Sequence, residues 1–249
     1  MPTLRRHPKV TAVALVLLGL VTVWSVKLVR LQLSVAQNRE FWSSPQGQAG
    51  GLTYVALGDS AAQGIGASRP ERGYVGLLAD RLRDQTGRPV QVVNLSRSGA
   101  RLADVLQDQL PRLRELDADI VTVAIGGNDV RHYDQTTFRA QLDQLTRGLP
   151  SGAFVADLPF FMHGRWEDDA QEASDLVTAA APAAGLVSVP LHQTQRSQGW
   201  SAMFTQFAAD WFHPNDRGHR VWADAFWQVM RDSDAVRPAG RDRPGGTRT

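Results

Sequence analysis

Short apolar runs alternate with helix-like segments from Leu52 to about Arg231, and this alternation limits the fold more than any other feature of the chain. The expected strands are β-rich runs at 52–57, 90–95, 120–125, 153–157 and 186–189. Helix-like stretches follow them at about 74–85, 103–116, 137–147, 169–184 and 218–230. Such alternation predicts a three-layer α/β/α domain, in which helices cover both faces of a parallel sheet. Ligands of these sheets bind at the carboxyl ends of the strands.

The same pattern divides the chain into four parts. Residues 52–232 are expected to form one domain, which is large enough to bury a core without disulfides or metals. Residues 1–33 form a basic segment with a membrane anchor or signal peptide, and residues 34–51 are polar enough for a linker. Residues 233–249 contain too few apolar side chains to fold, so we expect a disordered tail.

An uncharged apolar run extends from Val10 to Val26, directly after a cluster of basic residues. The run is short for a transmembrane helix, but Lys27 and Arg30 can extend their charged ends toward water. A signal peptide cleaved near 34–36 is the alternative, with a secreted product. We expect an uncleaved anchor with a cytoplasmic N-terminus and an exported domain, and Phe41-Trp42 at the lipid interface.

The distribution of charge argues against a nucleic-acid partner, although the sequence pI is about 9.4. Residues 1–51 carry a net charge of +5 and residues 233–249 a net charge of +2. Because the whole chain carries +2, residues 52–232 are left at −5. The expected domain is therefore mildly acidic, and its basic residues form no stripe along which a nucleic-acid backbone could bind.

Polar islands follow the first three expected strands: Gly58-Asp59-Ser60, then Gly99, then Gly126-Gly127-Asn128-Asp129. A fourth island, Asp210 to Pro214, precedes the last helix. The carboxyl ends of parallel strands meet at one edge of a sheet, so we expect the first three islands to converge. Together the islands supply a hydroxyl, oxyanion donors and a carboxylate near an imidazole, which are the groups that acyl transfer by a serine enzyme requires.

Ser60, Asp210 and His213 are the candidate catalytic residues. Asp210 and His213 are separated by three positions, so one turn places the carboxylate beside one ring nitrogen and leaves the other free for Ser60. A serine after a strand more often caps a helix, and an isolated Asp-x-x-His is usually a surface pair. The prediction therefore depends on the four islands occurring together.

The candidate oxyanion hole consists of the Ser60 amide, the Gly99 amide and the Asn128 side chain. Glycine lets a backbone N–H approach a substrate closely, and Asn128 follows two glycines at a strand end, where its amide can project freely. Each residue has an ordinary alternative as a turn residue. Asp59 is expected to anchor the loop rather than to transfer protons.

A second Asp-x-x-His pair, Asp129 and His132, is an alternative base or part of a metal site. A base approaches from the side opposite the oxyanion donor, whereas His132 lies beside Asn128. A metal needs more ligands than this pattern supplies, so we expect no metal and no cofactor. The other histidines of the domain are expected outside the site: His163 and His192 in loops without partners, and His219 in a structural role.

The islands are similar to blocks I, II, III and V of the SGNH hydrolases, also called GDSL esterases or lipases, over about Tyr54 to Trp227. Two motifs carry the resemblance, Tyr54-Val-Ala-Leu-Gly-Asp-Ser and Phe212-His-Pro-Asn-Asp-Arg-Gly-His. It implies a flavodoxin-like sheet, Ser60 as nucleophile, Asp210 and His213 as the other triad residues, and Ser60, Gly99 and Asn128 as oxyanion hole. Ala61 departs from the family pattern, where leucine is common. No serine lies in a Gly-x-Ser-x-Gly elbow, which disfavours the α/β-hydrolase alternative.

The expected activity is hydrolysis of a carboxylic acyl ester of a small molecule, lipid or glycan. Candidate substrate-binding residues are Phe160, Phe161 and Met162, which follow the fourth strand, and Phe204. Such aromatic stretches more often belong to a core than to a pocket. An O-acyltransferase or deacetylase acting on an envelope glycan is the alternative, because the same triad serves it. A non-catalytic lipid or glycan binder is a third, disfavoured by the intact reactive positions.

Overall fold

The computed structural model describes residues 8–162 and 164–236. A six-stranded sheet forms its centre, in the order β1-β3-β2-β4-β5-β6. The strands are β1 (Gln46–Gly47), β2 (Leu52–Gly58), β3 (Val90–Asn94), β4 (Ile120–Ala124), β5 (Phe154–Ala156) and β6 (Val187–Val189). Strands β2 to β6 are parallel, and β1 pairs antiparallel with β3 at one edge. The predicted α/β fold with a mostly parallel sheet is confirmed.

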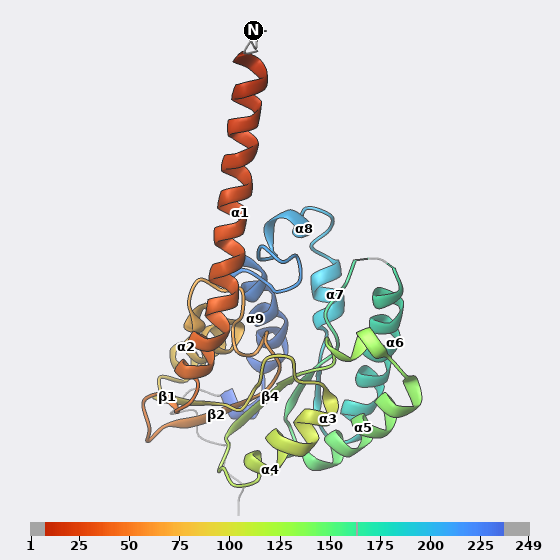
Figure 1. Cartoon of the computed structure of the whole chain (residues 1–249). Coiled ribbons are helices and arrows are strands. Elements are labelled where there is room, and N and C mark those ends of the chain that lie inside the picture. The colour runs from red at the N-terminus through yellow and green to blue at the C-terminus, as the bar shows by residue number, and fades with distance from the viewer. Residues whose placement is uncertain (1–7, 163, 237–249) are drawn as a thin grey trace, which may run out of the picture.

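Helices cover both faces of this sheet (Figure 1). The α-helices of the domain are α2 (Tyr74–Thr86), α3 (Leu102–Asp104), α4 (Leu110–Leu113), α5 (Gln135–Gly148), α6 (Arg165–Ala183), α7 (Leu191–Arg196), α8 (Ala202–Thr205) and α9 (Asp216–Met230). A π-helix, η2 (Val105–Gln109), joins α3 to α4. Short 3₁₀ helices are η1 (Pro70–Arg72), η3 (Asp129–His132) and η4 (Asp234–Val236).

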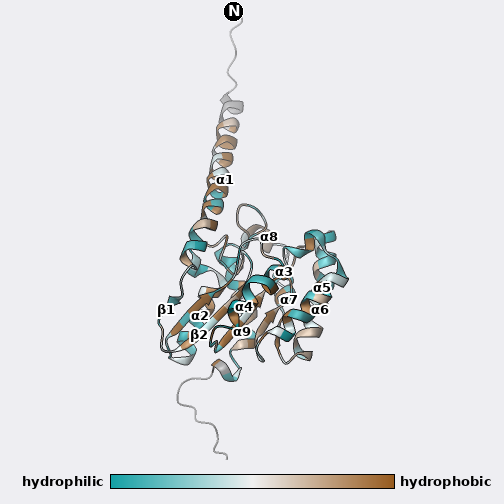
Figure 2. Ribbon diagram, turned by 60° about the horizontal axis from the view of Figure 1, so that its bottom comes forward, coloured by the Kyte–Doolittle hydropathy of each residue, from teal (hydrophilic) through white to brown (hydrophobic). Residues whose placement is uncertain are grey.

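Alternating side chains of β2 supply two separate hydrophobic cores, because successive residues of a strand point to opposite faces. Tyr54 and Ala56 pack in the core formed with α2 and α9. Val55 and Leu57 pack in the second core, to which α5 and α6 contribute. Figure 2 shows the strands as predominantly hydrophobic ribbons between these helices. Burial on both faces explains why the strands are continuous apolar runs in the sequence.

The N-terminal helix α1 (Pro8–Phe41) projects from the domain as one continuous element (Figure 1). Its side chains from Val13 to Val26 are exposed. Among the described residues it is the one helix long and apolar enough to cross a membrane, and a signal sequence near the N-terminus would have the same properties. The helix therefore fits an anchor or a signal.

Residues 34–51 differ from the predicted linker, because α1 continues to Phe41 and packs on the domain. The Asn38 side chain and the Trp42 indole both donate hydrogen bonds to the Gln63 carbonyl oxygen, at 2.8 and 3.1 Å. Trp42 is buried in the core and Phe41 packs against it, so the prediction that this pair lies at a lipid interface was wrong.

The first residues of the predicted disordered tail are also ordered. Residues Asp234 to Val236 form η4, and the Val236 side chain is fully buried in the core that contains α2. The burial of Val236 helps to hold this turn. Residues 237–249 lie outside the described residues.

Candidate active site

Strand β2 delivers Ser60 to the carboxyl edge of the sheet through a buried turn. Gly58 at the strand end is held by Gln109, whose side chain accepts from the Gly58 amide at 2.9 Å and donates to the Gly58 carbonyl at 2.8 Å. Gln109 is the last residue of the π-helix η2 and is almost fully buried. The sequence analysis missed Gln109. Its position directly before Leu110, in a helix that packs on the core, was a possible signal that this polar side chain is buried.

Ser60, His213 and Asp210 form one hydrogen-bonded chain. The Nδ1 atom of His213 lies 2.6 Å from Asp210 Oδ2, and its Nε2 atom lies 2.9 Å from Ser60 Oγ. Because a carboxylate can only accept, Nδ1 carries the proton and Nε2 accepts from the serine hydroxyl. The structure thus brings together the three residues predicted to be catalytic, from sequence positions 153 residues apart.

The segment that carries His213 is fixed on both sides. Asn215 caps α9 by accepting from the Arg217 and Gly218 amides, and its side-chain amide donates to the Phe207 carbonyl at 2.9 Å. Gly66 has φ +92°, and a Cβ there would collide with the Pro214 carbonyl oxygen and lie 3.1 Å from His213 Cβ. A glycine is required at this close approach, which places the imidazole over Ser60.

Hydrogen bonds hold Asp210 in its charged form. Burial would raise its pKa, but the hydrogen bond and charge of His213, with the amides of Phe212 and His213, together lower the pKa below its ordinary value. Both amides donate to Oδ1 at 3.1 Å, while Oδ2 accepts from the imidazole. A carboxylate held in this way fixes the histidine tautomer and favours a proton on the ring.

Asp59 has the opposite electrostatic environment. Burial raises the pKa of its carboxyl group to about 6, against the effect of the Ala61 amide and of the His213 charge. Its Oδ1 atom accepts from the Ala61 amide at 2.9 Å, and Oδ2 accepts from the Asn128 side chain at 3.2 Å. These contacts agree with the expectation that Asp59 anchors the loop.

Ser60, Gly99 and Asn128 end up at the same edge of the sheet, as their positions after three strands predicted. Within residues 8–162 and 164–236, no acceptor takes a hydrogen bond from the Ser60 or Gly99 amide. Gly99 has φ +77°, and the space where its Cβ would be is open. Asn128 does not project freely, however, because its amide donates to the Ala100 carbonyl at 3.0 Å as well as to Asp59.

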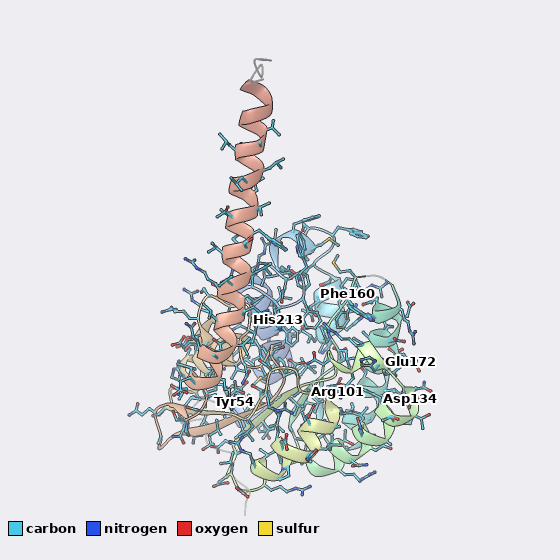
Figure 3. All side chains as sticks on the ribbon, in the orientation of Figure 1. Tyr54, Arg101, Asp134, Phe160, Glu172 and His213 are labelled. Carbon is cyan, nitrogen blue, oxygen red and sulfur yellow. The ribbon has the colours of Figure 1, made fainter. Side chains whose placement is uncertain are left out.

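A cavity of about 280 Å³ opens beside Ser60 and His213. Its walls are mostly apolar and come from the segment after β5, the segment before α9 and α9 itself: Pro159, Phe160, Phe161, Met162, Met203, Phe207, Trp211, Phe212 and Trp222. In the view of Figure 3, Phe160 and His213 lie above Tyr54, toward the end of the domain from which α1 projects. Three of the four predicted substrate-binding residues thus line the cavity. Phe204 does not line it, and 73% of its surface is exposed.

Two side chains that the sequence analysis missed hold the cavity wall after β5. Gln195 accepts from the Phe160 amide at 3.0 Å, and Glu167 accepts from the Phe161 amide at 2.7 Å. Both come from helices that pack behind the wall, α7 and α6. The Gln195 contact spans 35 residues, so sequence spacing held no signal for it, whereas Glu167 lies only six residues after Phe161.

The other histidines lie outside this chain of hydrogen bonds. His192 was predicted to lie in a loop without a partner, which was wrong: it is buried in α7, with Nε2 3.0 Å from Glu167 Oε1. Burial lowers the pKa of His219 to about 4, and its ring bonds the Tyr74 amide and the Ile65 carbonyl. His132 is exposed, and His163 lies outside the described residues.

Asp129, the other half of the second Asp-x-x-His pair, bonds elsewhere. Its carboxylate accepts from the Leu102 amide at 3.2 Å, and burial raises its pKa to about 6. Among residues 8–162 and 164–236, no cluster of three or more histidine, aspartate or glutamate side chains could hold a metal ion.

Comparisons with known proteins agree with this arrangement. The pattern of the GDSL-like lipase/acylhydrolase family matches residues 56–221. A lipase of Streptomyces rimosus is 32% identical over an alignment of 150 residues, and the match covers 47% of this chain and 53% of that lipase. The aligned part thus spans about half the length of that lipase.

Solved structures share the fold. LAE5, an alpha/beta hydrolase enzyme from the metagenome of Lake Arreo, superimposes with a TM-score of 0.60 at 26% identity, over 76% of this chain and 95% of that one. Axe2, an acetylxylan esterase of Geobacillus stearothermophilus, has a TM-score of 0.57 at 22% identity, over 75% and 96% of the two chains. At that identity the second likeness is one of fold.

Proposed function

Because the chain belongs to the GDSL-like lipase/acylhydrolase family, we propose that it is a serine esterase that cleaves carboxylic acyl esters through an acyl-enzyme on Ser60. The observation that carries the proposal is the hydrogen-bonded chain from Asp210 through His213 to Ser60. A serine, a base in contact with it and a carboxylate that orients the base are the parts of a nucleophilic triad.

In the first half of the reaction, the Ser60 oxygen attacks the ester carbonyl while His213 Nε2 takes the hydroxyl proton. The bond that forms joins Oγ to the carbonyl carbon, and the negative charge moves to the former carbonyl oxygen. When this intermediate collapses, the carbon–oxygen bond to the leaving alcohol breaks, and the imidazolium returns its proton to that oxygen. Asp210 stabilises the imidazolium through Nδ1.

In the second half, water takes the place of the alcohol. His213 removes a proton from the water as it attacks the acyl carbonyl, and the second collapse releases the carboxylic acid and returns the proton to Ser60. A sugar hydroxyl in place of water would make the same site an acyltransferase.

The free amides of Ser60 and Gly99 suit the developing oxyanion. Asn128 becomes a third donor when its Nδ2 group leaves Asp59 Oδ2, the longer of its two bonds, for the substrate oxygen. Such a donor typically contributes about 3 to 4 kcal/mol to transition-state stabilisation. In the absence of substrate, Asp59 then holds the Asn128 side-chain amide near the position from which it donates to the oxyanion.

The apolar cavity suits the acyl group of the ester. Its volume of about 280 Å³ is near the lower end of the range for small-molecule sites, about 300–1,000 Å³. Phe160, Phe161 and Met162 form one wall and Phe207 lies among the facing residues. We expect a short or medium acyl chain to fit inside the cavity and a longer chain to extend out of its mouth.

Helix α1 serves in this proposal as an uncleaved membrane anchor, with residues 52–232 exported. The exposed apolar side chains from Val13 to Val26 support an anchor, and the packing of Asn38 and Trp42 on the domain ties the anchor to the catalytic unit.

The test is a panel of aryl esters, from acetyl to palmitoyl, assayed with the wild type, Ser60→Ala and His213→Ala. We expect both variants to lose turnover on every ester, and Ser151→Ala, a serine at an exposed turn, to keep it. Turnover retained by Ser60→Ala would contradict the mechanism. A glycan acceptor added to the same assay separates transfer from hydrolysis, because transfer yields an acylated glycan in place of the free acid.

A further inference from the structure

The segment from Gly199 to Phe212, which we call the aromatic segment, exposes large apolar side chains beside the active site. The exposed fractions are 73% for Trp200, 73% for Phe204 and 57% for Trp211. The Phe204 and Trp211 rings contact each other edge to face, with centroids 6.0 Å apart. A cluster of exposed aromatic rings indicates a surface that binds something apolar.

The aromatic segment lies against α1, at the end of the domain from which α1 projects (Figure 1). The Trp24 indole donates a hydrogen bond to the Ala209 carbonyl at 3.1 Å. A groove of about 640 Å³ separates the two elements and is lined by Trp24, Lys27 and Arg30 on one side and by Phe204 on the other. The Trp24 hydrogen bond therefore fixes the position of the aromatic segment along the axis of α1.

If α1 spans a bilayer, the aromatic segment lies at the edge of that bilayer. The hydrocarbon core is about 30 Å thick and needs about 20 residues at 1.5 Å each, whereas the uncharged run from Val10 to Val26 covers only about 25 Å. The membrane boundary must then reach Lys27 and Arg30. Trp24 lies about one helical turn deeper than Lys27, so the Ala209 carbonyl that it bonds lies close to this boundary.

The residues at this level are those that a lipid surface binds. Tryptophan and phenylalanine favour the membrane interface, and lysine and arginine bind lipid phosphates. In the part of the chain that the structure describes, neither Lys27 nor Arg30 forms an ion pair with an acidic side chain, so both charges are available to phosphates. Their charge and the continuity with the apolar surface of α1 identify a bilayer as the occupant.

We infer that the aromatic segment rests in the lipid headgroups beside α1 and that the active site takes ester substrates directly from the bilayer. Met203, Phe207 and Trp211 line both the groove along α1 and the cavity beside Ser60, so the two spaces adjoin. A lipid ester could thus pass from the membrane to Ser60 without crossing water. The substrate part of the inference rests on the proposed esterase function.

Labels placed in the full chain test the contact with lipid directly, because the protein has no cysteine of its own. Trp200→Cys, Phe204→Cys and, as control, Asp117→Cys are labelled with an environment-sensitive fluorophore and reconstituted in lipid nanodiscs with α1 intact. Asp117 is exposed and precedes β4, at the opposite edge of the sheet. Nitroxide-bearing phospholipids should quench the labels at 200 and 204 strongly and leave the label at 117 unaffected.

Equal quenching at all three positions would overturn the inference, as would a chain that does not stay in the nanodisc. A second protein copy covering the segment would shield the labels from aqueous quenchers but not bring nitroxide lipids to them, and this result would also overturn it.

Trp200→Ser then tests the route of the substrate, since Trp200 lines neither space. We expect about fivefold lower kcat/KM on an ester dissolved in the bilayer, with activity on a water-soluble acetyl ester unchanged. Equal activity on both esters would overturn the route while leaving the esterase proposal intact. A wild type inactive on the soluble ester would instead contradict the esterase proposal, and the nanodisc labels would still report on the contact.

Discussion

Substitution of Gln109 should destabilise the domain more than its position in a short irregular helix suggests. The side chain makes two hydrogen bonds to Gly58, one to its amide at 2.9 Å and one to its carbonyl at 2.8 Å. Gln109 and Gly58 are both buried, and the Gly58 carbonyl also accepts from the Arg97 amide, so Gln109→Ala leaves the Gly58 amide as a donor without a partner and away from water. One unsatisfied buried donor costs about 1–3 kcal/mol in the free energy of unfolding.

Thermal unfolding followed by circular dichroism measures this effect. For a domain of this size, 1 kcal/mol corresponds to about 2–4 °C, so even the lower estimate lowers Tm by about 2–4 °C. Gln107→Ala is the matched control, because Gln107 lies in the same π-helix and is exposed. If both alanine variants unfold within 1 °C of each other, the reasoning about the buried Gly58 groups is refuted.

Three further variants probe the site. Asp210→Asn should lower kcat by about 10⁴ with little change in KM, because the Phe212 and His213 amides hold the asparagine oxygen, so that its NH₂ group donates to Nδ1 and the ring proton moves to Nε2; equal kcat in steady-state assays would contradict this. Burial raises the pKa of Asp59 to about 6. Between about pH 4 and 6 its carboxyl group therefore loses its proton in the unfolded state but keeps it in the folded state. As the pH rises through this range, the free energy of unfolding falls by at most about 3 kcal/mol. Urea unfolding should show a smaller fall for Asp59→Asn, and an unchanged slope would refute the assignment. Gly66→Ala should cost at least about 2 kcal/mol and lower kcat, since the new Cβ meets the Pro214 carbonyl at φ +92°; a stable, fully active variant would show that this approach is not required.

The sheet could be predicted from the sequence because its strands are buried on both faces. Runs such as 120–124 contain only apolar and threonine side chains, and the observed bounds differ from the expected ones by a residue or so. Strand β1 could not be predicted, because Gln46 and Gly47 have no apolar pattern and form a strand only by pairing with β3. The extension of α1 to Phe41 was missed for a related reason: contacts with Gln63, made across the fold, hold its polar last turns.

The placement of the site residues followed from topology rather than from side-chain detail. Ser60, Gly99 and Asn128 each follow a parallel strand, so the order of the strands brings them together. Whether the Asn128 amide is free could not be predicted, because its partners Asp59 and the Ala100 carbonyl depend on loop conformation. The catalytic roles of Ser60, Gly99 and Asn128 stay predictions until variants at these positions are assayed.

The unbroken course of α1 into the domain has a mechanical consequence. At 1.5 Å per residue its 34 residues form a rod about 51 Å long, whereas a flexible 18-residue connection would let the two ends wander about 23 Å apart. Because the helix is fastened to the domain at Asn38 and Trp42, the domain can neither rotate about the end of α1 nor sample the space around it. If α1 anchors the chain as proposed, the active site would stay at a fixed height above the membrane, and esters held in distant layers of an envelope would lie beyond its reach.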